Sequence, residues 1–149
     1  MKQGWLIYDV EGAKRNEWFI SECLRLAKDA GLRLSLQVIG RDFCLDSPPD
    51  YALMRAIAPD ISADLEGAGT RLFNPASVSR LANDKWATAV FGKEIGLPIL
   101  PTVLSSKAVD GSPFGYPVVV KSRDGHGGSE VFLLSSQEEY IDFFKNHSA

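Results

Sequence analysis

A lysine followed by a glycine-rich stretch gives the last third of the chain the residue types of a phosphate clamp. In YPVVVKSRDGHGGSEVFLL (116–134), a β-branched run ends in Lys121, and a second apolar run comes after the glycines. Glycine lets backbone amides approach an anion closely and tolerates positive φ, and a nearby lysine adds a charge that can bridge phosphate oxygens. The predicted clamp is a strand, a loop and a returning strand, with the loop residues Gly125, His126, Gly127, Gly128 and Ser129.

Two well-known phosphate-binding motifs do not match this loop. A Walker A loop needs GK[ST] with a helix after it, whereas here an apolar, strand-like run follows the glycines. The dinucleotide fingerprint needs GxGxxG spacing between a strand and a helix, and that spacing is absent. The plainer alternative is an ordinary β-turn, with Lys121 extending its stem from a strand end to water.

Three further basic residues are candidates for the same chemistry. Lys85 lies in NDKWAT (83–88), where an exposed helix lysine is the plainer interpretation. Arg55 follows a predicted strand at its carboxyl end, which is where open α/β sheets place ligands. Arg15 lies in the loop after the first predicted strand, at the same edge. Either arginine could bind a substrate carboxylate through paired hydrogen bonds, and the plainer interpretation of both is a surface arginine.

The first 74 residues have the pattern of a small open α/β sheet. Residues 4–10 form a compact apolar run, residues 16–30 carry a helical apolar stripe, and residues 32–40 alternate. This order predicts a parallel strand pair joined by a helix, with a polar loop at 11–15. A further strand, helix and strand are predicted at 51–56, 57–69 and 70–74.

The remaining residues predict linking helices and an antiparallel lobe. Residues 75–96 are predicted as a helix in two pieces, with Pro75 and Asp84 at their starts. A last helix begins at Ser136, with Glu139 three residues later as a capping box. Between these helices, three strands with hairpin-like links are predicted at 99–106, 118–122 and 131–136.

Composition narrows the class of protein. A length of 149 residues fits one average domain or two small lobes. The net charge of −3 and the lack of a basic run exclude nucleic acid as the main partner. Two cysteines and two histidines without CxxC spacing predict no zinc site and a reduced, cytoplasmic setting. No apolar run approaches the roughly 20 residues of a membrane span.

Two segments taken in order resemble the ATP-grasp superfamily. They are NDKWATAVFGKEIGLPILPT (83–102) and the lysine–glycine segment 116–134. The phrase GLP-x-LPT is typical of ligases similar to the RimK type, which join glutamate or other amino acids to a carboxylate. The resemblance covers nearly the whole chain. It implies an α/β, Rossmann-like open parallel sheet (the pre-ATP-grasp domain, 1–74), linking helices (75–97) and the first, largely antiparallel α+β lobe of an ATP-grasp fold (98–149).

The resemblance also implies a reaction and a set of ATP-binding residues. Lys85 and Lys121 look like the two lysines that contact the nucleotide phosphates, and residues 125–129 look like the flexible loop over the β- and γ-phosphates. The implied reaction transfers a phosphoryl group from ATP to a carboxylate. An amine then attacks the acylphosphate, which gives an amide, ADP and phosphate. Phosphoryl transfer depends on positioning and charge neutralisation, which lysines and a glycine loop can supply.

The chain departs from the family in one large respect. ATP-grasp enzymes continue into a second lobe that carries the adenine hinge and the magnesium ligands, whereas this chain stops at Ala149. We therefore expect an N-terminal fragment, inactive by itself, whose ATP-bound magnesium is held by residues absent from this chain. The expected partners are ATP and small carboxylate and amine substrates or a protein or peptide acceptor. An unpaired sheet edge also makes a homo-oligomer a reasonable expectation.

Two other classes of function fit parts of the sequence. One is a non-catalytic nucleotide-sensing or partner-binding module that kept the fold. The other is a flavodoxin-like response domain with a fused hairpin lobe, which leaves the lysine–glycine segment 116–134 unexplained.

Overall fold

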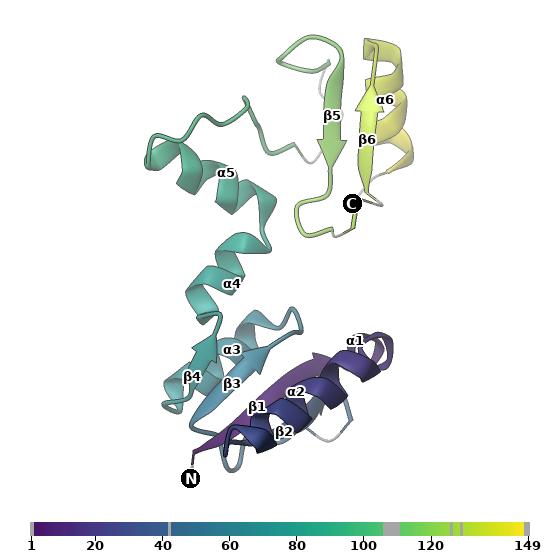
Figure 1. Ribbon diagram of the computed structural model, residues 1–149. Coiled ribbons are helices and arrows are strands. Elements are labelled where there is room, and N and C mark those ends of the chain that lie inside the picture. The colour runs from purple at the N-terminus through teal and green to yellow at the C-terminus, as the bar shows by residue number, and fades with distance from the viewer. Residues whose placement is uncertain (1, 42, 106–110, 126, 129, 148–149) are drawn as a thin grey trace. The chain divides into compact units, whose positions relative to one another are not determined.

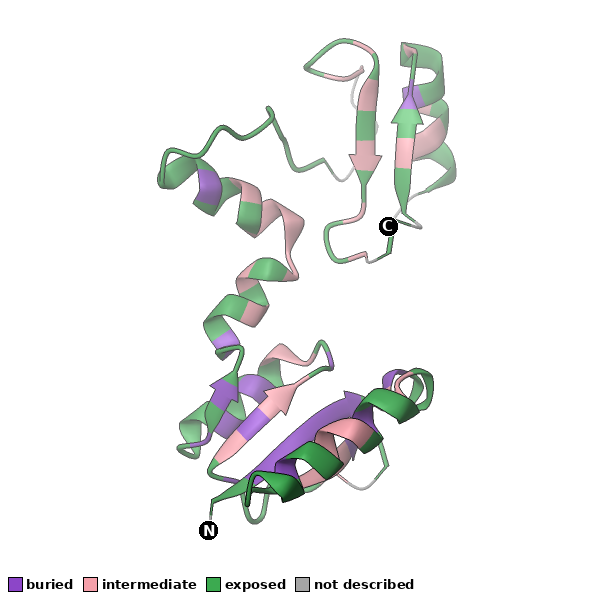
Figure 2. Ribbon diagram, viewed as in Figure 1, coloured by how far each residue is buried: buried purple, intermediate pink, exposed green. Residues whose placement is uncertain are grey.

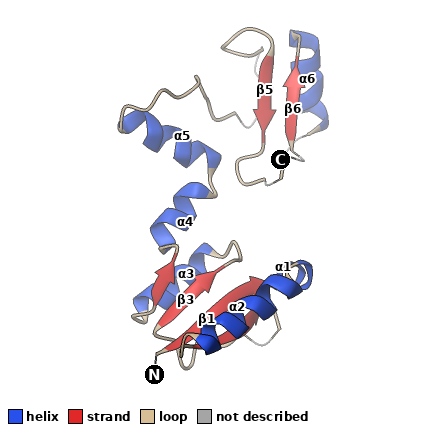
Figure 3. Ribbon diagram, viewed as in Figure 1, coloured by secondary structure: helices blue, strands red, loops and turns tan. Residues whose placement is uncertain are grey.

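The computed structural model describes residues 2–41, 43–105, 111–125, 127–128 and 130–147. The chain forms two compact units, Met1–Arg80 and Leu81–Ala149. Each unit has its own sheet (Figures 1 and 3). The division gives the predicted open sheet and the predicted hairpin lobe separate cores.

A four-stranded parallel sheet forms the centre of the first unit. Its strands are β1 (Gln3–Asp9), β2 (Arg33–Ile39), β3 (Tyr51–Met54) and β4 (Arg71–Phe73), in the order β2-β1-β3-β4. Leu6 in the central strand lies opposite Leu36 on one side and Leu53 on the other. The strand order reverses direction between β1 and β3, so the carboxyl ends of these two strands form the edge where open α/β sheets bind ligands.

Helices bury both faces of β1, which explains its unbroken apolar sequence. Trp5 and Ile7 pack with Leu65 of α3 (Pro59–Gly67) on one face. On the opposite face, Leu6 and Tyr8 pack with Ile20 of α2 (Glu17–Asp29). Buried residues therefore run from Gly4 to Tyr8, and only the two end residues of the strand are exposed (Figure 2).

The segment predicted as a polar loop at 11–15 is instead a short helix, α1 (Val10–Arg15). The reason is capping at its start: the Asp9 carboxylate accepts a hydrogen bond from the backbone N–H of Gly12 at 2.6 Å. At its end, the side-chain amide of Asn16 donates to the Gly12 carbonyl oxygen at 2.7 Å. The polar composition of this segment predicted a loop, whereas two side-chain hydrogen bonds to the backbone stabilise it as a short helix.

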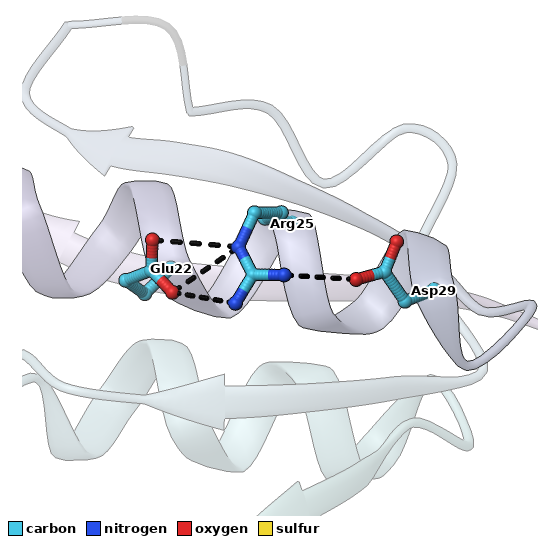
Figure 4. A network of polar contacts seen from close by, with 3 residues as sticks. All are labelled: Glu22, Arg25 and Asp29. Atoms are coloured by element: carbon cyan, nitrogen blue, oxygen red, sulfur yellow. Dashed lines mark hydrogen bonds and ion pairs between the residues drawn. The ribbon is translucent and has the colours of Figure 1, made fainter.

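The exposed face of α2 carries a small ion-pair network, shown in Figure 4. Arg25 lies 2.8 Å from a carboxylate oxygen of Glu22 and 2.9 Å from one of Asp29. Glu22 and Asp29 each lie about one helical turn from Arg25, so the network links neighbours within one helix. Exposed pairs of this kind add little to stability.

The predicted two-piece helix is confirmed as α4 (Ala76–Ala82) and α5 (Lys85–Glu94). Asp84 caps α5, since its side chain accepts a hydrogen bond from the backbone N–H of Ala87. Gly96, with φ of 76°, follows the end of α5 in the left-handed conformation that favours glycine.

The second unit contains an antiparallel hairpin of β5 (Val118–Lys121) and β6 (Val131–Leu134), backed by α6 (Gln137–Asn146). Phe132 packs against Phe143 of α6 with ring centroids 4.9 Å apart, and Leu134 and Tyr140 are buried. Ser136 caps α6 and accepts from the Glu139 N–H at 3.2 Å, as its capping-box sequence predicts.

The strand predicted at 99–106 is wrong over 99–105, where the described backbone forms no strand, and residue 106 lies outside the described residues. Pro98 and Pro101 flank the start of this segment and lack the amide hydrogen that a sheet ladder needs. Apart from this strand and α1, the predicted fold class is confirmed: a parallel α/β sheet precedes an antiparallel α+β unit. Within the described ranges, no helix combines the length and apolarity needed to cross a membrane.

Candidate phosphate-binding site

The two candidate segments, around Lys85 and around the glycine loop, meet in the second unit. The Lys85 ammonium donates a hydrogen bond to the carbonyl oxygen of Gly125, 40 residues later in the chain. The backbone N–H of Lys85 donates to the carbonyl oxygen of Arg123 at 2.9 Å. The start of α5 is therefore bound to the loop through both main chain and side chain.

An ion pair joins the same two segments. Asp84 Oδ2 lies 2.7 Å from Arg123 Nε and 2.5 Å from Arg123 Nη2, while Asp84 Oδ1 accepts from the Ala87 N–H at 2.9 Å. The hydrogen bond from Arg123, followed by the one from the Ala87 backbone, lowers the pKa of Asp84 to about 2. The same hydrogen bond raises the pKa of Arg123. Both groups are therefore charged at neutral pH.

The base of the glycine loop is fixed by hydrogen bonds of its own. Ser122 Oγ accepts from the Gly125 N–H at 2.8 Å and donates to Glu130 Oε2 at 2.5 Å. The Ser122 N–H also donates to the Glu130 carbonyl oxygen at 3.2 Å. A Cβ on Gly125 would lie 2.0 Å from both Ser122 Oγ and Glu130 Oε2, so only glycine fits this arrangement.

The outer part of the loop needs glycine for a different reason. Gly127 and Gly128 are exposed and have φ angles of 70° and 79°, which is the left-handed region where a Cβ is strained. Successive glycines of this kind allow the backbone to approach an anion. His126 and Ser129, the other two predicted loop residues, lie outside the described residues.

Lys121 lies on the face of the hairpin turned away from α6. Along β5, Val118 and Val120 are half-buried while Val119 and Lys121 are exposed, which is the alternation of a strand with one covered face. Val119 pairs with Leu133, and Lys121 pairs with Val131, so the open face combines one cation with three exposed apolar side chains.

The described residues also form two open cavities. One, of about 520 Å³, lies in the second unit beside Tyr116 and Tyr140. The other, of about 550 Å³, lies in the first unit, where Leu34, Leu53 and Phe73 line it. Neither is lined by the candidate lysines or by residues 122–130. The candidate phosphate site, formed by a helix start and a loop, lies outside both of these cavities.

Comparison with known proteins gives relatives in sequence and in fold. Human N-acetylaspartylglutamate synthase A is 35% identical over a match that covers 63% of this chain and 28% of the synthase. Beta-citrylglutamate synthase B of Danio rerio is 31% identical over 75% of this chain and 30% of that protein. The crystal structure of a RimK domain ATP-grasp protein from Sphaerobacter thermophilus DSM 20745 superposes with a TM-score of 0.60.

The chain is similar in sequence to these two synthases and in fold to the RimK domain ATP-grasp protein. The superposition covers 97% of this chain and 58% of the solved one at 21% identity, so it establishes the shared fold. No family model matches the chain. The chain spans less than a third of the length of these two curated relatives.

The two candidate arginines belong to the first unit. Arg55 follows β3 as predicted, and its N–H donates to the Ile7 carbonyl oxygen of β1 at 2.8 Å, which places it at the edge where the strand order reverses. Its guanidinium carbon lies 5.7 Å from the ring centroid of Phe19 on α2. Arg15 is exposed and ends helix α1, so the loop predicted to carry it is absent.

The sequence analysis missed Arg123 and assigned Asp84 only a capping role. The available signal was proximity along the chain: Asp84 precedes Lys85, and Arg123 lies between Lys121 and Gly125. Opposite charges beside two segments expected to share one ligand could have indicated a contact. Among the described residues, no cluster of three or more His, Cys, Asp or Glu side chains is suited to a metal ion.

Proposed function

We propose that this chain supplies the phosphate-binding half of the ATP site of a carboxylate–amine ligase that works through an acylphosphate. The observation that carries the proposal is the contact of Lys85 with Gly125, because it joins the two segments whose sequences resemble the ATP-grasp superfamily. Under this proposal the chain divides into a pre-ATP-grasp domain (1–74), linking helices (75–97) and the first ATP-grasp lobe (98–149). The chain alone lacks turnover.

The proposed site holds ATP mainly by its phosphates. Lys85 and Lys121 would neutralise phosphate charge, and the loop 125–129 would offer backbone N–H groups to the β- and γ-phosphates. The exposed apolar face beside Lys121, formed by Val119, Val131 and Leu133, suits the flat ring of the base. Six of the seven proposed contacts lie within one strand–loop segment, so one loop movement would admit or enclose the nucleotide.

Magnesium accompanies ATP in phosphoryl transfer and neutralises charge on the β- and γ-phosphates. The described residues offer no cluster of three metal-binding side chains. We therefore assign no step of the reaction to a metal held by this chain. What the chain contributes is positive charge and backbone donors on one side of the phosphates.

We propose a carboxylic acid and an α-amino acid of the glutamate type as the substrates of the complete ligase. The relatives are named as synthases of N-acetylaspartylglutamate and beta-citrylglutamate, and both products contain glutamate. Arg55 and Arg15 would bind a substrate carboxylate, since guanidinium groups pair with carboxylates through two hydrogen bonds. The free cysteines Cys23 and Cys44 fit a reducing, cytoplasmic setting.

Trapping of the acylphosphate tests this function. The complete protein is incubated with ATP, magnesium, hydroxylamine and one carboxylic acid at a time, and hydroxamate and ADP are measured. Hydroxylamine displaces phosphate from an acylphosphate, so a ligase of this class forms one hydroxamate for each ADP. If ADP is released but none of the acids gives a hydroxamate, the reaction does not pass through an acylphosphate. Saturable ATP binding without ADP release from the complete protein would favour the nucleotide-sensing module instead.

A further inference from the structure

We propose that Asp84 and Arg123 are positioning residues, which fix the start of α5 against the glycine loop and so place Lys85 for phosphate binding. The inference rests on the proposed function, which it deepens by naming what holds the site together. Neither residue is assigned a contact with ATP.

Asp84 divides its two carboxylate oxygens between two tasks. Oδ1 accepts from the Ala87 N–H inside α5, and Oδ2 accepts from Arg123 in the loop. The helix start and the loop therefore share one carboxylate group. A rotation of that carboxylate would disturb the cap and the ion pair together.

Arg123 contacts the helix start at two points. Its guanidinium binds Asp84, and its carbonyl oxygen accepts from the Lys85 N–H at 2.9 Å. Two contacts from one residue restrict the rotation of the segment between Lys121 and Gly125, whereas a single contact would act as a pivot. The hydrogen bond from Lys85 Nζ to the Gly125 carbonyl oxygen then follows from this geometry.

The ion pair is partly exposed, which limits its role in overall stability. The side chain of Arg123 is 56% exposed and that of Asp84 21% exposed, so water and salt screen their attraction. Loss of the pair should change the local geometry of the site more than the folding of the unit. This separates a positioning role from a purely structural one, because binding and stability would respond differently.

The chain provides a matched control in Arg25. Its guanidinium also binds carboxylates at 2.8 and 2.9 Å and is also 56% exposed, but its partners Glu22 and Asp29 lie on the same helix in the other unit (Figure 4). Arg25→Gln therefore removes the same charge and the same kind of contact without touching α5 or the loop.

The test uses Asp84→Asn, Arg123→Gln and Arg25→Gln in the 149-residue chain. Asparagine keeps an oxygen that can cap α5 but loses the charge. We expect the dissociation constant of magnesium-ATP, from an NMR titration, to rise about tenfold in both site variants and to stay unchanged in the control. The thermal midpoint should stay within about 2 °C of wild type in all three.

Two further variants exclude a simple charge effect. Arg123→Lys restores a cation and should recover part of the affinity lost in Arg123→Gln. The double variant Asp84→Asn/Arg123→Gln should bind no more weakly than either single variant, because both remove the same contact. Fully additive losses, or site variants that bind like Arg25→Gln, would overturn the inference.

A second measurement separates this inference from the proposed function. Amide hydrogen exchange at Lys85 and Gly125, whose N–H groups are hydrogen-bonded, is followed without nucleotide, and we expect exchange about tenfold faster in Asp84→Asn and Arg123→Gln than in wild type. If wild type fails to bind ATP, the proposed function and the positioning role in it fall together. If wild type binds ATP and exchange is unchanged in the variants, only the positioning role falls.

Discussion

Lys85 and Gly125 are joined by a hydrogen bond from the lysine ammonium to the glycine carbonyl oxygen, across 40 residues of sequence. Lys85 is the first residue of α5, and Gly125 lies at the base of the loop between β5 and β6. A lysine so placed has its charge at the loop before any ligand binds. Preorganised charge of this kind is what phosphoryl transfer requires of a protein.

Lys121 should contribute to turnover rather than to folding. It is exposed at the end of β5, so Lys121→Ala removes no packing, but it removes a charge from the proposed phosphate site. In the complete ligase we expect ADP formation to fall about a hundredfold. Lys93→Ala, at the exposed last turn of α5, serves as the control. Near-normal turnover of Lys121→Ala would show that Lys121 does not contribute to the phosphate site.

Gly125→Ala should disrupt the base of the loop. The new Cβ would meet Ser122 Oγ at 2.0 Å, and the short serine side chain cannot move aside without losing its bond to the Gly125 N–H. We expect a loss of about 1 kcal/mol in the free energy of unfolding of this unit, measured with urea, and weaker ATP binding. Adding Ser122→Gly should restore part of both. If Gly125→Ala alone bound ATP as wild type does, the base of the loop would not require glycine at this position.

Acid should release the contact between α5 and the loop. The folded-state pKa of Asp84 is lowered from 3.8 to about 2, so ionisation of this carboxyl stabilises the folded state above pH 4. That stabilisation is lost as the pH falls through about 2. The protection factor of the Gly125 amide, which corrects for the intrinsic pH dependence of exchange, should therefore fall between pH 4 and pH 2, and Asp84→Asn should abolish this fall. Glu22, whose pKa Arg25 also lowers, should titrate without affecting Gly125.

The stability of the first unit should depend on Leu65 of α3, which is completely buried and packs with Trp5 and Ile7. Leu65→Ala leaves a cavity in this core, and we expect the free energy of unfolding to fall by about 3 kcal/mol in urea titration. Leu26→Ala is the matched control: Leu26 of α2 is 55% exposed, so its substitution should lower the free energy of unfolding much less. Equal losses in the two variants would contradict the assigned core.

Local patterns predicted most of the fold because the strands and helices of this chain have clear periodicity. The apolar run around Leu6 and Ile7 indicated a buried central strand, and the caps Asp84 and Ser136 marked two helix starts correctly. The α1 helix was not predicted because its sequence is polar, and it forms because the Asp9 side chain caps its start. The strand predicted at 99–106 is wrong over 99–105, because Pro98 and Pro101 lack the amide hydrogen that a sheet ladder needs.

The sequence predicted the separate residues of the candidate site but not the contact between α5 and the loop. Residue types identified Lys85, Lys121 and the glycines as candidates, since each carries its chemistry in its own side chain or backbone. The Asp84–Arg123 pair depends on how a loop folds back on a helix 39 residues earlier, and no local period encodes that distance. Long-range pairing of charged residues is visible only once the hairpin and α5 are placed together.

The most direct test of the ATP site is an NMR titration of the chain with magnesium-ATP and, separately, with adenosine. The ¹H–¹⁵N resonances of Lys85, Lys121, Gly125, Gly127 and Gly128 report on the proposed phosphate contacts. The account predicts saturable shifts of these resonances with magnesium-ATP that adenosine does not reproduce, with weak affinity. Shifts confined to residues 1–80, or equal shifts with adenosine, would contradict a phosphate site at Lys85 and the glycine loop.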